Sequence, residues 1–133
     1  MIDSHDFKRK SGVPNEFERR RTERLLDEFV SEKASLLHNG PGEVRYRQRG
    51  WTIELYQAQP HPVHKMRVIR LPVALFQGAR DGQSWKLYFR GQSGHWQAYP
   101  DPASAFDDPV EAPYMRLTAA LDLVAADELG LFW

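Results

Sequence analysis

The sequence predicts an α+β fold in which a five-stranded antiparallel meander sheet is flanked by an N-terminal and a C-terminal helix. Two segments with apolar residues at helical spacing lie near the two ends of the chain. Between them, five short segments rich in aromatic and β-branched residues are separated by turns that contain glycine or proline. Short turns between successive strands produce an antiparallel sheet whose strands follow their order in the sequence.

The composition fits one folded domain without disulfides. The chain has 133 residues, of which 41% are hydrophobic and none is cysteine. A domain of this length buries roughly two thirds of the surface that its unfolded chain exposes, so it needs no metal to stay folded. We predict a flexible polar arm over residues 1–12 and a single domain over residues 13–133. No signal-peptide or membrane-spanning pattern occurs, and the lack of cysteine suits a reducing compartment, so we expect a cytoplasmic location and no membrane partner.

The first helix is predicted to start at Pro14, because proline is favoured in the first turn of a helix. Glu16 and Glu18 then lie at the positive end of the helix dipole. Apolar residues recur at helical spacing from Leu25 onward, and the glycines and proline of residues 38–42 end the helix. Four arginines crowd the first turns as a candidate partner-binding cluster: Arg19, Arg20, Arg21 and Arg24. The alternative is that they pair with neighbouring acidic residues on a solvated helix face.

The first two strands are predicted over residues 43–48 and 51–59, joined by a two-residue turn at Arg49-Gly50. This turn places all the large apolar residues of the hairpin on one face, and a slip by one residue would scatter them over both faces. The resulting pairs are Gln48 with Trp51, Arg47 with Thr52, Tyr46 with Ile53, Arg45 with Glu54 and Val44 with Leu55.

The third strand, over residues 65–77, is apolar at both parities from Val68 to Phe76. That pattern is typical of a strand that is covered on both faces, so we expect the two helices to lie on opposite faces of the sheet. Pro72 predicts a bulge or a locally unpaired position, because proline cannot donate to the strand ladder.

The fourth and fifth strands are predicted over residues 84–90 and 95–100, joined by the turn at 91–94. We expect Arg90 to pair with His95. One face then carries Trp85, Leu87, Phe89, Trp96 and Ala98. The opposite face then carries Lys86, Tyr88, Arg90, His95, Gln97 and Tyr99.

The second helix is predicted to open at Pro113 and to end at Gly130. The apolar stripe of this helix consists of Tyr114, Leu117, Leu121, Val124 and Ala125. Residues 131–133 are too apolar to remain in water, so we expect them to dock against the sheet or to form a short edge strand.

The formal net charge is zero, but the charges are unevenly distributed. Residues 1–100 hold 17 Lys and Arg against 11 Asp and Glu, whereas residues 101–133 hold one Arg against seven acids. A basic body with an acidic C-terminal segment is compatible with a polyanion-binding face, or with two parts that attract each other within the fold. The acidic, proline-rich loop Asp101–Ala112 is a further candidate contact surface.

The predicted registers place basic and tyrosine side chains together on the sheet face opposite the aromatic core. The possible polyanion-binding residues are Arg45, Arg47, Lys86, Tyr88 and Arg90. Tyrosine rings among cations can stack bases and neutralise phosphates. The alternative is that a helix covers part of this face and that the long cations lie along its rim.

No motif indicates a reaction. The chain has neither a nucleophile elbow nor a glycine-rich phosphate loop. His61 and His64 are a close pair, but no spacing supplies the further ligands that a zinc site needs. We assign no catalytic, cofactor-binding or metal-binding residue and expect no cofactor.

A more specific pattern lies at residues 84–99, where Ser-Trp-Lys-Leu-Tyr-Phe is followed after a short turn by His-Trp-Gln-Ala-Tyr. Pro102, a leucine-bearing helix and a terminal Gly-Leu-Phe at 130–132 follow. From about Val44 to the C-terminus, this pattern resembles a family of small bacterial proteins catalogued as domain of unknown function 3024. The resemblance implies a shared fold and supplies no activity. The chain departs from the family's pattern in the long loop Asp101–Ala112.

The leading hypothesis from the sequence is a non-catalytic binding or accessory module that recognises a protein partner. The first alternative is a nucleic-acid-associated module that uses the arginine and tyrosine face. The second is an enzyme whose unrecognised site is assembled from residues distant in the sequence.

Overall fold

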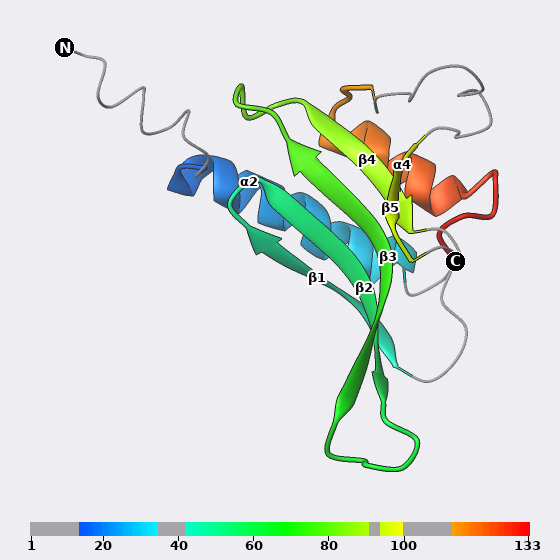
Figure 1. Cartoon of the computed structure of the whole chain (residues 1–133). Coiled ribbons are helices and arrows are strands. Elements are labelled where there is room, and N and C mark those ends of the chain that lie inside the picture. The colour runs from blue at the N-terminus through cyan, green and yellow to red at the C-terminus, as the bar shows by residue number, and fades with distance from the viewer. Residues whose placement is uncertain (1–13, 35–41, 91–93, 100–112) are drawn as a thin grey trace.

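The sheet of the computed structural model is an antiparallel meander whose strand order is β1-β2-β3-β4-β5, as the sequence predicts (Figure 1). The structure describes residues 14–34, 42–90, 94–99 and 113–133. The predicted arm at 1–12 and the loop Asp101–Ala112 lie outside the described residues. The strands are β1 Glu43–Arg49, β2 Thr52–Pro60, β3 Val68–Gly78, β4 Trp85–Arg90 and β5 Trp96–Ala98.

The N-terminal helix α2 spans Glu16–Glu28 and continues as the short π-helix η1, Phe29–Ala34. Its start is fixed by a capping box rather than by the proline. The side-chain oxygen of Asn15 accepts from the N–H of Glu18 at 2.8 Å, and the Glu18 carboxylate accepts from the N–H of Asn15 at 3.1 Å. This reciprocal pair satisfies two amide groups that a helix start leaves without partners. The helix therefore begins two residues after Pro14.

The C-terminal helix α4 spans Leu117–Ala126 and is shorter than predicted at both ends. Residues before it are extended, because Met115 pairs with Trp85 through two backbone hydrogen bonds of 2.7 and 2.8 Å. Tyr114 is therefore not part of the helical stripe, which was predicted wrongly at that position. The helix ends at Asp127, which adopts a left-handed conformation with φ +42°. Within the described residues, neither helix is long and apolar enough to cross a membrane.

Both helices pack on the same face of the sheet, so the prediction of opposite faces is wrong (Figure 1). Leu26 and Phe29 from the first helical segment share one apolar core with Leu121 and Val124 of α4. The two segments are also linked at the surface, where the Lys33 ammonium lies 3.2 Å from the carboxylate of Asp122. Neither of the described helices therefore covers the opposite face of the sheet.

The reason for that error lies in β3, whose apolar run is not buried on both sides. Val68 and Leu71 are 56% and 40% exposed, because both precede the β3–β4 pairing, which begins at Ala74. Val68 also lies beyond the end of β1, where the β2–β3 hairpin projects from the sheet (Figure 1). The predicted bulge at Pro72 is confirmed by a register shift between Leu55 and Tyr56 opposite it. The extra residue brings two neighbours, Val73 and Ala74, into the same core.

The β1–β2 hairpin keeps the predicted faces but has a different register. Arg49 pairs with Thr52, so the turn residues are Gly50 and Trp51 instead of Arg49 and Gly50. Gly50 has φ +57° and occupies the first central position of the turn, a place where glycine is favoured. The shift is by two residues along the pairing, so side chains stay on the faces predicted for them. Arg47 lies opposite Glu54 rather than Thr52.

The β4–β5 hairpin differs by one residue, which reverses the face of every side chain in β5. Arg90 pairs with Trp96 and not with His95. Trp96 therefore lies on the uncovered face, whereas Trp51 and Trp85 remain together in the core with ring centroids 5.9 Å apart. Tyr99, predicted to be outside, is 5% exposed in the core and donates its N–H to the carbonyl of Leu87.

The C-terminal tail docks as predicted, against the core side of the sheet. Phe132 is buried and its ring centroid lies 5.5 Å from that of Tyr99. The tail is held by the carboxylate of Asp127, which accepts the backbone N–H groups of residues 131, 132 and 133 at 2.8 to 3.2 Å. The indole N–H of Trp133 donates to the carbonyl of Val124 at 2.9 Å.

Two further polar contacts fix the helix layer and the β3–β4 turn. The Tyr46 hydroxyl donates to the carboxylate of Asp27 at 2.7 Å and ties β1 to α2. Desolvation, followed by this hydrogen bond and the charge of Asp27, raises the pKa of Tyr46. In the turn, the Asp81 carboxylate accepts the N–H groups of Gln83 and Ser84. These bonds lower the pKa of Asp81 from its ordinary value of 3.8.

The β5 register predicts unequal effects of two aromatic truncations. Tyr99→Ala is expected to lower the free energy of unfolding by about 3 kcal/mol or more, because it opens a cavity in the core. Trp96→Ala is expected to cost about 1 kcal/mol or less, since that ring lies on the uncovered face. Urea denaturation followed by far-UV circular dichroism measures both. A larger loss for Trp96→Ala than for Tyr99→Ala would contradict the register.

The tail contacts predict that Asp127→Ala destabilises the protein by about 1–3 kcal/mol, because three buried or half-buried amides lose their acceptor. Asp127→Asn should cost less, since asparagine keeps one acceptor oxygen and tolerates the left-handed conformation. The matched control is Asp122→Ala on the same helix, which removes only an exposed ion pair worth about 0–1 kcal/mol. Equal losses for Asp122→Ala and Asp127→Ala in urea denaturation would refute this role.

Candidate functional site

The sheet face that lies opposite the two helices, called the outer face here, carries a mixture of cations and aromatic rings. The strand registers place on it all five residues predicted as possible polyanion-binding residues: Arg45, Arg47, Lys86, Tyr88 and Arg90. The same face also carries Tyr56, and the bulge in β3, the β5 register and the Met115 bridge add Arg70, Trp96 and Tyr114. The structure thus brings the predicted residues onto one surface and nearly doubles the set.

One row of side chains crosses the whole outer face. Arg47 in β1 pairs with Glu54 in β2, and Glu54 pairs with Leu75 in β3. Leu75 pairs with Tyr88 in β4, and Tyr88 pairs with Ala98 in the edge strand β5. Leu75, Tyr88 and Ala98 are half-buried. A strip of apolar and aromatic surface therefore runs between a basic edge at β1 and a second basic region at β4. The two regions are three strand spacings apart, or about 14 Å.

The cations of β1 are paired with carboxylates. Arg47 donates to the Glu54 carboxylate at 2.9 Å, and side-chain exposures of 41% and 21% make this pair partly shielded. Arg45 donates to the carboxylate of Glu43, its neighbour on the same strand face. That hydrogen bond and the charge of Glu43 raise the pKa of Arg45. The expected partner of Arg45 was Glu54, and the change follows from the two-residue shift of the hairpin register.

The other cations of the outer face stack on aromatic rings. The guanidinium carbon of Arg90 lies 5.5 Å from the ring centroid of Trp96, and the Lys86 ammonium lies 4.7 Å from that of Tyr114. At the base of the projecting hairpin, Arg70 lies 5.2 Å from the ring of Tyr56. Contacts of this kind are worth about 0.5–1 kcal/mol at exposed sites, so they hold the cations over the rings without fixing them there.

The arginines of the N-terminal helix lie on the other side of the sheet. Arg19, Arg20 and Arg24 are exposed on α2, and Arg20 pairs with Glu16 at 3.8 Å. Arg21 lies 6.0 Å from the ring of Phe17. The two basic clusters predicted from the sequence are therefore separated by the sheet, and no single ligand contacts both across it.

The histidine pair at the tip of the β2–β3 hairpin is a structural element of that tip. The Nδ1 atom of His61 accepts the backbone N–H groups of Val63 and His64 at 3.0 and 2.9 Å. The two imidazole rings are 5.1 Å apart. Across the part of the chain that the structure describes, no three His, Asp or Glu side chains are placed to hold a metal ion.

A family model described as domain of unknown function (DUF3024) matches residues 14–133. The chain belongs to the DUF3024 family. No curated protein and no solved structure matches it. The match starts about 30 residues before the segment that carries the resemblance in the sequence, so the DUF3024 domain includes helix α2 as well as the sheet.

Three outer-face residues of this DUF3024 protein escaped the sequence analysis for separate reasons. Trp96 was assigned to the core because the β4–β5 loop was taken one residue too short. Tyr114 was assigned to a helical stripe, although it precedes α4 in extended backbone. Arg70 reaches the outer face only because the bulge at Pro72 changes the phase of β3. Only the bulge had a sequence signal, the proline itself.

Proposed function

We propose that this DUF3024 protein is a non-catalytic binding module whose outer face binds single-stranded nucleic acid. The observation that carries the proposal is that cations and aromatic rings alternate over an open sheet face, with no described helix above it. Sheets that bind single strands use this combination, because every base has a face that stacks on an aromatic ring and every nucleotide has a phosphate.

The charge of the outer face supports this proposal more than the net charge of the chain does. By register, the strands present six cations and two carboxylates on this face: Arg45, Arg47, Arg49, Arg70, Lys86 and Arg90, with Glu43 and Glu54. The Debye length at physiological ionic strength is about 8 Å. A phosphate bound on this face therefore interacts mainly with the nearby excess of positive charge, and the zero net charge of the whole chain matters little.

The exposed aromatic rings support stacking. Tyr114 is 59% exposed, and Trp96 and Tyr88 are half-buried, so each ring has a face or edge open to a ligand. A base that stacks on Trp96 displaces the guanidinium of Arg90, which then reaches a phosphate. Base stacking is worth about 1–3 kcal/mol per base, more than the exposed cation–π contact it replaces.

The proposal predicts salt-dependent binding of a labelled single-stranded oligonucleotide in fluorescence anisotropy. The double variant Arg47→Ala, Arg90→Ala should weaken binding and reduce the slope of log K against log salt by about 1.4, roughly 0.7 for each lost phosphate contact. Trp96→Ala should weaken binding at all salt concentrations without changing the slope, because it removes stacking and no charge.

The matched control is the double variant Arg20→Ala, Arg24→Ala, which removes the same charge from α2 on the opposite side of the sheet. Binding should be unchanged within about twofold apart from the weak long-range effect of charge. The proposal fails if no binding occurs at low salt, or if both double variants weaken binding equally.

A second candidate function is recognition of a protein partner by the β2–β3 hairpin. The tip of this hairpin carries large apolar side chains in water: Val63 is 73% exposed and Met66 is 97% exposed. Between Glu54 and Asp81 the chain has no acidic residue, so the hairpin is also basic. Exposed apolar residues rimmed by charge are typical of an interaction site, and the chemistry fits an acidic partner with an apolar groove.

The hairpin proposal predicts that one protein co-purifies with the tagged chain at fixed stoichiometry. The double variant Val63→Ser, Met66→Ser should abolish co-purification, because it removes the apolar anchors while leaving the fold intact. Arg47→Ala, Arg90→Ala serves as the control and should retain the partner. A chain that always purifies alone, or loss of the partner in both variants, argues against this function.

Three predictions from the sequence remain proposals. We expect residues 13–133 to act as one domain with a polar arm at 1–12, and the exposed cluster Arg19, Arg20, Arg21 and Arg24 to serve a partner. We also expect a cytoplasmic location, which the lack of cysteine supports.

A further inference from the structure

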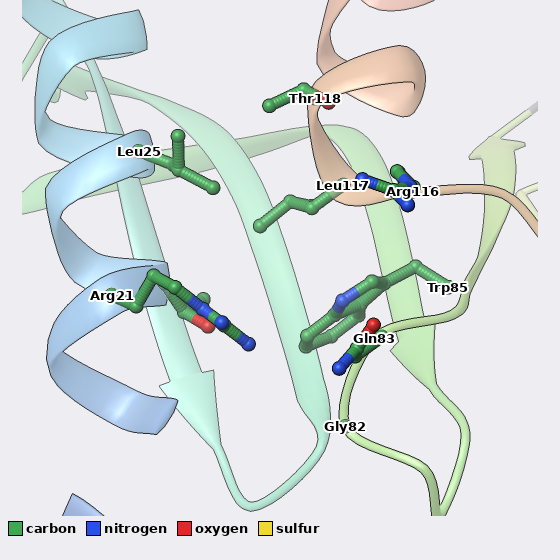
Figure 2. A pocket seen from close by; sticks show the side chains of 9 residues that line it. Arg21, Leu25, Gly82, Gln83, Trp85, Arg116, Leu117 and Thr118 are labelled. Carbon is green, nitrogen blue, oxygen red and sulfur yellow. The ribbon is translucent and has the colours of Figure 1, made fainter. Parts of the chain in front are cut away.

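A cavity lies on the helix side of the sheet, between α2, the β3–β4 turn and the start of α4 (Figure 2). It has a volume of about 200 Å³. Water occupies about 30 Å³ per molecule in the liquid, so the cavity has room for a phosphate group and a few atoms attached to it. Leu25 and Leu117 are among its apolar lining residues, and its polar side chains include Arg21, Thr22, Gln83, Arg116 and Thr118. The sheet separates it from the outer face.

Two arginines from different elements line this cavity. Arg21 comes from α2 and Arg116 precedes α4, and neither forms an ion pair with a carboxylate among the described residues. Figure 2 shows the Arg21 side chain reaching from its helix toward the indole of Trp85. Two unpaired guanidinium groups beside one small space create a region that favours an anion.

The first turn of α4 lines the same cavity through Leu117 and Thr118. Arg116 is the N-cap residue and its side chain makes no capping hydrogen bond, and the first turn contains no acidic residue. The amides of Leu117, Thr118 and Ala119 therefore lack the acceptors that most helix starts provide. Helix α2 is different, since Asn15 and Glu18 satisfy its first amides. The start of α4 is left open where the cavity is.

An independent observation comes from the wall of the cavity. Trp85 is only 2% exposed, lines the cavity, and makes no hydrogen bond with its indole N–H in the described part of the chain. Figure 2 shows its indole projecting between Arg21 and Leu117. Among the described residues, the indole N–H that is buried without a partner is that of Trp51, whereas the N–H of Trp85 is not sealed from solvent. Because Trp85 lines the cavity, a ligand there would accept from its N–H in place of water.

We propose that this cavity binds a phosphate group, either free phosphate or the phosphate of a small monoester. The guanidinium groups of Arg21 and Arg116, the amides at the start of α4 and the indole N–H of Trp85 are donors that reach the space from three directions. Such a set suits a tetrahedral dianion. These groups are donors, and none of the described lining residues carries a carboxylate, although that of Glu18 lies beside Gly82 at the edge of the cavity.

The test follows the four tryptophan indole signals of the full chain in ¹H–¹⁵N NMR spectra during titration with inorganic phosphate. Trp85→Phe identifies the Trp85 signal. The expected result is a saturable shift of that signal with phosphate and none with chloride at the same ionic strength. Glucose 6-phosphate is titrated in parallel: tighter binding than phosphate identifies a monoester ligand, and equal or weaker binding identifies free phosphate.

Charge variants separate a built site from general attraction of anions. Arg116→Ala and Arg21→Ala should each weaken phosphate binding by about tenfold, because each removes a charged hydrogen bond. Arg24→Ala, an exposed arginine of the same helix outside the cavity, and the outer-face double variant Arg47→Ala, Arg90→Ala should leave it within about twofold. A Trp85 signal that does not move with phosphate in the wild-type protein overturns the proposal, as does equal weakening by Arg24→Ala.

Discussion

The alternation of side chains along β1, β2 and β4 gives the sheet one apolar face, and both helices depend on that face for their burial. Leu26 of the first helix and Val124 of the last are fully buried in one core, which also contains Leu55 and Leu87 of the sheet. At roughly 25 cal/mol for each Å² of apolar surface removed from water, this shared core is the main source of stability. The outer face, with its charged pairs, offers nothing comparable to a helix.

The position of the candidate binding face follows from that asymmetry. A helix above β1 and β4 would bury Arg47 and Glu54 and the cations of β4, at a cost of several kcal/mol for each ion that lost its water. The terminal tail shows the same preference, since Phe132 inserts beside Tyr99 on the core side. The open face and the closed core are thus two consequences of one pattern of residues.

The sequence was a good guide to the elements and to β1 and β2, because there the alternation covers many residues. Moving the β1–β2 turn from Arg49-Gly50 to Gly50-Trp51 shifted the pairs and left every side chain on its predicted face. The sequence was a poor guide to β5, which has only three residues, with Trp96 at its start and Tyr99 just after its end at the opposite parity. There the choice between Trp96 and Tyr99 depends on distant partners: Phe132 packs on Tyr99 and Arg90 on Trp96.

The sheet face on which the helices pack also could not be predicted from local sequence patterns. An apolar strand such as β3 indicates two covered faces only if all of it lies within the sheet. Here Val68 and Leu71 precede the β3–β4 pairing, which begins at Ala74, and the bulge at Pro72 turns two consecutive residues to the core. Neither the start of that pairing nor the phase after the bulge can be obtained from residue types alone. The cavity between α2 and α4 depends on the same fact and was not predicted.

The paired state of the outer-face cations does not weaken their capacity to bind a polyanion. Arg90 and Lys86 lie over rings, where exposed contacts are worth about 0.5–1 kcal/mol, and Arg47 has a single carboxylate partner. A phosphate contact releases counterions as well as supplying charge, a gain that an intramolecular pair does not have. Holding the guanidinium groups against rings also reduces the rotamer freedom lost on binding, which for a free arginine costs up to about 2 kcal/mol. The resting pairs therefore keep the cations beside the surfaces on which bases stack, and a ligand has only to exchange one weak partner for a stronger one.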